Sequence, residues 1–361
     1  MRTLVTFVVL GWLALLGLPA AADPAAAGVG FGDYKLDRVV DGDTVRVEGL
    51  DSSLRLLGID TEETFKHAKE RRAYAKGWAS YVQAARGASP RPAKFATPLG
   101  DVAKTWAEAW FAGVDRVRLE RDDPHEIRDR YHRYLAYVLV EKHGTWLNYN
   151  VEAVRAGMSP YFPKYGRSRR YDHDFITAEA EAKAAHRGIW APGAEAYPDY
   201  PEREAWWTAR GDFVAAFRTA AAGAQRPRFI DLTHDDAATE LEALVGRGVS
   251  VLGTVGEIEP GAPVAGIRTR GRSPTRVLLD HHIALVFFDP EVVAASGIAA
   301  WKGEWIRVTG TPSLYKSRLQ IVIDRADQIE LSAVPGLTKP TATAAAKPPR
   351  NRTHDVSIPA P

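Results

Sequence analysis

Apolar residues recur at alternating or consecutive positions between residues 34 and 140, and this pattern predicts a series of short β-strands. Two of the strands flank an Asp-Gly turn at residues 41–42. Residues 54–59 form a nearly continuous apolar run, which is typical of a strand covered on both faces. Short strands followed by helices predict a small α+β barrel over residues 30–194. The helices are expected at residues 99–111, 148–156 and 174–186.

A second strand-rich region follows a proline-rich boundary at residues 192–201. Before it, two helical patterns predict a helical connector over residues 195–247. Five apolar segments and one short helical stretch then predict a second small β-barrel of the oligonucleotide-binding (OB) kind over residues 248–334. Residues 335–361 are rich in Pro, Ala and Thr, which predicts a disordered tail.

The first 22 residues have the pattern of a secretory signal peptide. Met1-Arg2 supplies positive charge, residues 4–18 are largely apolar, and small side chains precede Asp23. An apolar run of about 15 residues is shorter than the roughly 20 that a membrane-spanning helix needs. We therefore expect cleavage after about residue 22, no stable membrane insertion afterwards, and a secreted or periplasmic mature protein.

The chain of 361 residues contains no cysteine, and this excludes several kinds of chemistry. Disulfide frameworks, cysteine-based zinc sites, iron–sulfur clusters and thiol nucleophiles are all ruled out. Any bound metal must be held by oxygen atoms or imidazoles. The formal net charge is only +2, so a local concentration of charge is more informative than the total.

Acidic residues and arginines gather in three short segments of the first predicted barrel. Asp43 follows the predicted turn, and Asp60 follows the buried strand. Carboxylates at the ends of strands can meet at one rim of a barrel and hold a hard cation. Without cysteines or paired histidines nearby, such oxygen ligands favour Ca²⁺ over Zn²⁺. The three segments are residues 41–44, 55–63 and 128–133.

Other residues of these segments suit the hydrolysis of a phosphodiester. Glu63 can take a proton from a water molecule beside the metal. Arg55 and Arg133 can bind phosphate oxygens and stabilise the charge that develops on phosphorus. A plainer interpretation is that Asp-Gly is a hairpin turn and that the Arg/Asp runs are surface ion pairs. The position of Arg55 inside an apolar run favours a site, because a buried guanidinium needs an anionic partner.

The order of these segments resembles the thermonuclease (staphylococcal nuclease-like) family over residues 34–192. Two later segments also agree with the family pattern, so the likeness extends beyond the candidate site. The matching stretches are D-G-D-T at 41–44, R-L-L-G-I-D-T-E-E at 55–63, D-R-Y-H-R-Y-L-A-Y at 129–137, N-Y-N-V-E-A-V-R-A-G at 148–157 and A-E-A-E-A-K-A-A-H-R-G-I-W at 178–190.

The resemblance implies a five-stranded barrel with helices that hydrolyses single- and double-stranded DNA and RNA with Ca²⁺ and leaves 3′-phosphate ends. It implies that Asp43, Asp60 and the carbonyl oxygen of Thr61 bind the metal. Asp41 would support the site from nearby, and Thr44 would lie beside the metal.

The resemblance also implies the catalytic and substrate-binding residues. Glu63 would be either the general base or the residue that orients the attacking water. Arg55 and Arg133 would bind the scissile phosphate, and Arg133 could assist the leaving 5′-oxygen. Contacts to a terminal phosphate are implied for Arg130 and Tyr131, and a nucleotide-stacking role for either Tyr161 or Tyr165.

The sequence departs from the family pattern in three places. Glu62 stands where the family has proline, and we expect it to add negative charge next to the metal. His132 replaces a glycine at a position where a positive φ is expected. Residues 64–97 are longer than the family minimum and carry a net charge of +7. This stretch is either a solvated loop or a basic flap over nucleic acid, with Tyr74, Trp78 and Tyr81 available to stack on bases.

The second predicted barrel carries no catalytic pattern and no motif that identifies a partner. Asp280-His281-His282 is a poor metal candidate, because adjacent histidines on a strand face opposite ways. Two basic loops are compatible with nucleic-acid binding, although a structural or protein-binding role fits equally well. The loops contain Arg268, Arg270, Arg272 and Arg276 in one case, and Lys316 and Arg318 in the other.

Together these patterns predict an exported, Ca²⁺-dependent, sugar-nonspecific nuclease whose substrates are DNA and RNA. One alternative is a nuclease-like barrel that binds nucleic acid without cutting it. The other is an envelope interaction protein in which the C-terminal region docks a partner.

Overall fold

The computed structural model describes most of residues 30–340, and no helix in the part described is long and apolar enough to cross a membrane. Several sequence predictions lie outside the described residues: the signal peptide at 1–22, most of the tail at 335–361, Arg130, the His281-His282 pair, and the loop arginines Arg268, Arg270 and Arg272. The described ranges are 30–89, 91–129, 131–224, 228–261, 273–280 and 283–340.

Five strands close the first barrel. β1 (Gly30–Asp41), β2 (Thr44–Val47) and β3 (Leu54–Leu56) form an antiparallel meander, and β3 then pairs in parallel with β6 (Tyr134–Lys142). β5 (Arg116–Glu120) pairs antiparallel with both β6 and β1. At 12 residues, β1 is long enough to pair with β5 through its first half and with β2 through its second half. The predicted five-stranded α+β barrel is therefore confirmed.

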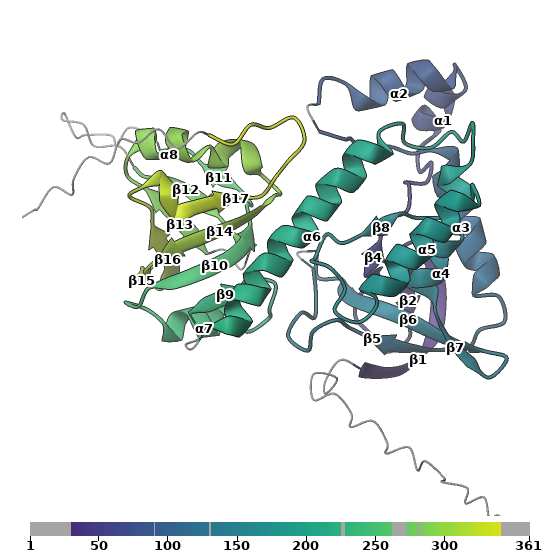
Figure 1. Ribbon diagram of the computed structural model, residues 1–361, viewed down its shortest axis with the longest axis horizontal. Helices are drawn as coiled ribbons and strands as arrows, with labels where there is room; N and C mark the ends of the chain where they lie inside the picture. Colours follow the sequence, from purple (N-terminus) through teal and green to yellow (C-terminus); the bar gives the residue numbers. More distant parts are fainter. Residues whose placement is uncertain are drawn as a thin grey trace, which may run out of the picture.

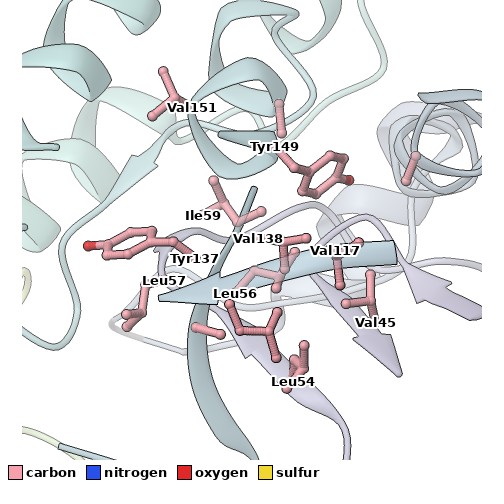
Figure 2. Close-up of a cluster of buried hydrophobic side chains, with 14 of the residues drawn as sticks. Val45, Leu54, Leu56, Leu57, Ile59, Val117, Tyr137, Val138, Tyr149 and Val151 are labelled. Carbon is pink, nitrogen blue, oxygen red and sulfur yellow. The ribbon is translucent and has the colours of Figure 1, made fainter. Parts of the chain in front are cut away.

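Aliphatic side chains from the strands fill the barrel (Figure 2). Leu54 and Leu56 of β3 are at most 1% exposed, and Val45 and Val117 belong to the same cluster. Burial of each such side chain stabilises the fold by roughly 1.5–3 kcal/mol. Arg55 lies between the two leucines and is itself buried, so the barrel core places one charged group at its edge.

Three helices pack on this barrel: α3 (Pro98–Trp110), α4 (Tyr149–Arg155) and α5 (Asp172–Ala184). They lie within a few residues of the predicted helices. The side chains of Thr97 and Asn148 accept backbone N–H groups at the starts of α3 and α4, which explains where these helices begin. The shorter elements of this half are β4 (Gly58–Ile59), β7 (Thr145–Asn148), β8 (Tyr161–Phe162) and a 3₁₀ turn at Gly188–Trp190.

The long stretch before α3 folds as an insertion with two short helices, α1 (Ala68–Tyr74) and α2 (Trp78–Arg86). Tyr74, Trp78 and Tyr81 pack against one another in a small core of their own. The expectation that these rings are available to stack on bases is wrong for Tyr81, which is 7% exposed. The aromatic residues of the insertion hold it together instead.

The C-terminal half contains a second barrel, built from a four-stranded and a five-stranded sheet, whose strand order resembles that of the first barrel. β10 (Val249–Thr254) pairs antiparallel with β14 (Trp305–Gly310), and β12 (Thr275–Leu278) pairs antiparallel with β13 (Ala284–Phe287). β13 pairs in parallel with β16 (Arg318–Val322), as β3 does with β6. Both halves thus have the predicted OB-like topology. The remaining elements are β11 (Ile258–Glu259), α8 (Pro290–Ser296), β15 (Pro312–Tyr315), β17 (Ile329–Leu331) and 3₁₀ turns at Ile298–Trp301 and Ala326–Gln328.

A 24-residue helix, α6 (Tyr200–Gly223), lies between the two barrels (Figure 1). Trp207 packs edge-on against Phe162 of the first barrel, with ring centroids 4.9 Å apart. The segment predicted to be a helical connector also contains α7 (Ala237–Ala243) and a strand, β9 (Phe229–Asp231). Because β9 pairs in parallel with β10, the connector is not purely helical: its last part belongs to the sheet of the second barrel.

Candidate active site

Two of the predicted metal ligands meet on a single buried arginine. Asp43 lies in the turn between β1 and β2, Arg55 in β3, and Asp60 directly after β4. Arg55 Nη1 lies 2.6 Å from Asp43 Oδ2, and Arg55 Nη2 lies 2.5 Å from Asp60 Oδ1. Burial alone would lower the pKa of Arg55, but the two carboxylates raise it above its ordinary value. The guanidinium therefore stays charged and holds two acids from different segments of the chain side by side.

Asp60 has a second cationic partner that comes from the insertion. Lys94 Nζ lies 2.6 Å from Asp60 Oδ2, and the backbone N–H of Asp60 donates a 2.8 Å hydrogen bond to Ser159 Oγ. Burial would raise the pKa of Asp60, but Lys94 and Arg55 outweigh it and hold that pKa below its ordinary value. Asp60 is therefore ionised at neutral pH.

Asp41 adds a third carboxylate beside Asp43, whose backbone N–H donates to Asp41 Oδ1 at 3.3 Å. Burial and the charge of Asp43 together raise the pKa of Asp41 to about 7. Asp43 is fixed by the hydroxyl of Thr44, at 2.9 Å, and by the backbone N–H of Thr61, at 3.3 Å. These hard oxygen donors suit Ca²⁺.

The acidic side chains do not form a complete cage of metal ligands. Within the part of the chain that the structure describes, no three or more Asp, Glu or His side chains converge closely enough to hold an ion by themselves. A cation at Asp43 and Asp60 would therefore need further oxygens, such as a backbone carbonyl and water. The carbonyl of Thr61, directly after Asp60 in the chain, is a suitable source.

Glu63 lies outside the buried acid pair. Its side chain is 39% exposed, and Lys66 Nζ lies 3.1 Å from its Oε2. Its backbone is held tightly, because its carbonyl oxygen accepts a 3.0 Å hydrogen bond from the N–H of Thr97. Gly100 of α3 packs directly against that carbonyl, so a Cβ at this position would overlap it. An accessible carboxylate on a fixed backbone is suited to accept a proton from water or to orient it.

The side chain of Glu62 lies in a different environment from that of Glu63. The expectation that Glu62 adds negative charge next to the metal is wrong. It is 2% exposed, and its Oε1 accepts hydrogen bonds from the N–H of Tyr197 at 2.7 Å and the hydroxyl of Tyr200 at 2.8 Å. The hydroxyl of Thr97 donates to Oε2. Burial raises the pKa of Glu62. This side chain therefore joins the first barrel to the start of α6.

Arg133 lies on the loop before β6 and is held by a buried acid. Asp129 Oδ2 accepts hydrogen bonds from Arg133 Nε at 2.9 Å and Nη2 at 2.6 Å. The side chain of Arg133 is 28% exposed, compared with 6% for Arg55, so it is the more accessible of the two arginines. His132 has a φ of 61°, which confirms the expected left-handed backbone. The ring of Tyr131 is 61% exposed and lies 5.6 Å from Arg133 Cζ.

Of the two candidate stacking tyrosines, Tyr165 is the one near the arginines. Burial raises the pKa of Tyr165, and the positive charges of Arg55 and Arg133 counteract that rise. Tyr161 instead donates a 2.6 Å hydrogen bond to Asp172 and is buried in the barrel core. The ring of Tyr161 is therefore not accessible to a nucleotide.

The basic residues of the insertion are mostly paired with acids elsewhere in the chain. Five of the eight form ion pairs, and the stretch contains two helices, so it is not an unstructured loop and much of its positive charge is balanced by acids outside it. In the sequence, Lys94 is one of eight basic residues in this stretch, and nothing distinguishes it from the others. No sequence motif identifies Gly100 as a residue that supports the site. The i, i+4 spacing of Asp129 and Arg133 is a signal that could have been used. The pairs are Lys66–Glu63, Arg71–Asp101, Arg86–Glu202, Arg91–Glu304 and Lys94–Asp60.

Comparison with known proteins agrees with this geometry. Residues 53–192 match the family described as staphylococcal nuclease homologue. An uncharacterised protein of Methanocaldococcus jannaschii is 31% identical over 158 residues, which cover 43% of this chain and 70% of that protein. The thermonuclease of Staphylococcus hyicus is 28% identical over 163 residues, which cover 44% of this chain and 75% of that protein. The prophage-derived endonuclease YokF of Bacillus subtilis is 28% identical over 162 residues, covering 44% of each chain.

The closed barrel and the family match together define a nuclease that hydrolyses phosphodiester bonds. More specifically, this chain belongs to the staphylococcal nuclease homologue family. The second barrel lies outside the matched residues.

Proposed function

We propose that this protein is an exported, Ca²⁺-dependent nuclease that cleaves both DNA and RNA and leaves 3′-phosphate ends. The observation that carries the proposal is the pairing of Arg55 with Asp43 and Asp60, which fixes two hard carboxylates together. The family match supports the reaction class. The signal-peptide pattern of residues 1–22 supports export.

Asp43, Asp60 and the carbonyl oxygen of Thr61 would hold the cation. When bound, Ca²⁺ supplies positive charge that stabilises the negative charge developing on the scissile phosphate. Arg55 keeps the two carboxylates together and adds its own charge at the same place. Thr44 keeps Asp43 in position through its hydroxyl.

Glu63 would act on the attacking water, whose oxygen forms the new bond to phosphorus. As general base it takes a proton from that water, and the bond between phosphorus and the 5′-oxygen breaks. The leaving 5′-oxygen takes up a proton from solvent, and the products are a 3′-phosphate and a 5′-hydroxyl. Asp129 occupies Nε and Nη2 of Arg133, which leaves Nη1 as the edge that can contact a phosphate oxygen. An arginine held in this way needs little reorganisation in the transition state.

Substrate outside the scissile bond would lie along the exposed side of Arg133. The exposed ring of Tyr131 and the neighbouring Arg130 would contact a terminal phosphate. Tyr165, with the positive charges of Arg55 and Arg133 close to it, would contact a nucleotide.

The test is cleavage of labelled single-stranded DNA and RNA by the mature chain with Ca²⁺ and with EGTA. We expect Ca²⁺-dependent cutting that leaves 3′-phosphates and is lost in Glu63→Gln but kept in Glu108→Gln, which alters an exposed acid on α3. Cutting in EGTA would contradict the calcium requirement. Binding without cutting would favour the alternative of an inactive nucleic-acid-binding module.

Export is tested separately by fractionation of cells that express the full chain, followed by N-terminal sequencing of the processed protein. We expect nuclease activity outside the cytoplasm and a first residue at or near Asp23. An intact N-terminus in a cytoplasmic protein would contradict the proposed localisation.

A further inference from the structure

A short segment of the insertion, residues 91–95, runs from the second barrel to the active site. At one end, Arg91 Nη1 lies 2.9 Å from Glu304 Oε1 and also donates to the carbonyl oxygen of Lys302 at 3.2 Å. Arg91 Nη2 donates to the carbonyl oxygen of Ala300, also at 3.2 Å. Glu304 is 1% exposed and the side chain of Arg91 is 27% exposed, so this ion pair is partly shielded from solvent. The second barrel thus fixes one end of the segment.

The middle of the segment is fixed by α6 and the loop before it. The guanidinium of Arg203 donates to the carbonyl oxygen of Ala93. The hydroxyl of Tyr197 donates to the carbonyl oxygen of Phe95 at 2.9 Å, and the two rings meet at 4.9 Å between centroids. The backbone on both sides of Lys94 is therefore held in place.

Lys94 reaches the active site from this fixed backbone. Its Nζ lies 2.6 Å from one carboxylate oxygen of Asp60 and 2.7 Å from the other. The side chain is 48% exposed, whereas that of Asp60 is 5% exposed. Because Lys94 engages both oxygens of Asp60, any divalent cation that binds this carboxylate must compete with the ammonium group.

We propose that Lys94 is a positioning residue that sets the cation affinity of the active site, and that the second barrel controls it through Arg91. This inference rests on the proposed Ca²⁺ requirement. Arg55 and Lys94 already share Oδ1 of Asp60, and Lys94 also engages Oδ2, so a divalent cation that approaches this carboxylate is repelled by the ammonium, which weakens its binding. The anchor at Arg91 keeps the ammonium near Asp60 and so strengthens the competition. The second barrel thereby acts on the nuclease site without contributing a ligand to it.

The test is calorimetric titration of Ca²⁺ into the mature full-length chain and its variants. We expect Lys94→Met to lower the Kd for Ca²⁺ on the order of 10-fold. Lys94→Arg should restore the wild-type Kd. Arg91→Met should lower it by about 2- to 5-fold, and the double variant should match Lys94→Met alone because both changes act through one contact. The rise in Tm on adding Ca²⁺ should be larger in Lys94→Met than in the wild type.

Lys69→Met is the matched control, because it removes one positive charge from an exposed position on α1 of the same insertion. Its Kd should stay within about twofold of the wild-type value, since exposed charges are screened. Equal shifts in Lys69→Met and Lys94→Met, or no shift in Lys94→Met, would overturn the inference while leaving the calcium proposal intact. Additive effects of the Arg91 and Lys94 changes would overturn the control by the second barrel. A wild-type chain that binds no Ca²⁺ would overturn both proposals.

Discussion

The carboxylate of Glu62 accepts a 2.8 Å hydrogen bond from the hydroxyl of Tyr200, so the residue next to Glu63 links the first barrel to the first turn of α6. A proline at position 62, as in the family pattern, could not make this contact. The glutamate at this position therefore serves to attach α6, the long helix between the two barrels, to the first barrel. It adds a structural contact rather than a change in the chemistry of the acid pair.

Glu62→Ala should lower the free energy of unfolding by roughly 1–3 kcal/mol, because it leaves buried donors without an acceptor. The donors are the hydroxyls of Tyr200 and Thr97 and the N–H of Tyr197. Urea denaturation of the mature chain measures the change. Glu48→Ala, at an exposed acid paired with Lys35, should alter stability by less than about 0.5 kcal/mol. An unchanged stability together with an altered Ca²⁺ affinity would instead place the Glu62 carboxylate in the metal site.

Gly100→Ala should lower kcat by about 10-fold or more and cost about 1–3 kcal/mol of stability, because a Cβ at this position would displace the backbone of Glu63. Steady-state cleavage and urea denaturation measure the two effects. Gly223→Ala is the matched control, since that glycine is also helical but faces open space. It should leave kcat unchanged. A fully active Gly100→Ala enzyme would show that the placement of Glu63 tolerates this shift.

The barrel and the pair of acids at Arg55 could be predicted because short, contiguous segments of the sequence specify them. A turn, a buried strand and the residue after that strand bring Asp43, Arg55 and Asp60 together once the strands pair. The strongest single indication of a site was Arg55 inside an apolar run, because a buried guanidinium needs an anionic partner. The structure provides two such partners, Asp43 and Asp60. The OB-like topology of the second barrel followed in the same way from the order of its strands.

The contacts of Lys94 and Glu62 could not be predicted, because each depends on how distant segments pack. Lys94 is 34 positions from Asp60 in sequence and reaches it from a segment that contacts both the second barrel and the start of α6. Two of the partners of Glu62, Tyr197 and Tyr200, are more than 130 positions away, at and just before the start of α6. The prediction that Tyr81 is available to stack on bases was wrong for a related reason. An aromatic residue in a basic stretch can either stack on a base or fill a small core, and the sequence does not distinguish the two.

Arg133→Ala should lower kcat by about 10²–10³-fold, as expected for the loss of one donor that stabilises the transition state. Asp129 would still accept hydrogen bonds from the backbone N–H groups of Tyr131 and residue 133, so the loop should keep its fold. Circular dichroism and single-turnover cleavage measure both points. Arg38→Ala, at an exposed arginine on β1, should cut at the wild-type rate. Near-normal turnover in Arg133→Ala would remove this arginine from the mechanism.

Between the two barrels, Glu126 lies in a buried group of charges. Its carboxylate is 3.3 Å from Arg218 of α6, and Arg218 also pairs with Asp231 of β9 at 2.9 Å. Burial raises the pKa of Glu126 to about 8; the ion pair with Arg218 opposes that rise, and Asp231, Asp122 and Asp123 add to it. The ordinary value of 4.5 applies to the unfolded chain. Between these two pH values the folded protein holds a proton that the unfolded chain has lost.

The free energy of unfolding should therefore fall as pH rises from 4.5 to about 8, with a contribution from Glu126 of at most about 1.4 kcal/mol per pH unit. Below this window both states are protonated, so the stabilising contribution is fully present; above it both have lost the proton. Glu126→Gln should remove this part of the slope, so that the variant gains stability relative to the wild type between about pH 5 and pH 9. Urea denaturation across that range measures the difference, and Glu240→Gln, at an exposed acid on α7, should keep the wild-type slope. Parallel curves for Glu126→Gln and the wild type would show that Glu126 titrates alike in the folded and unfolded chains.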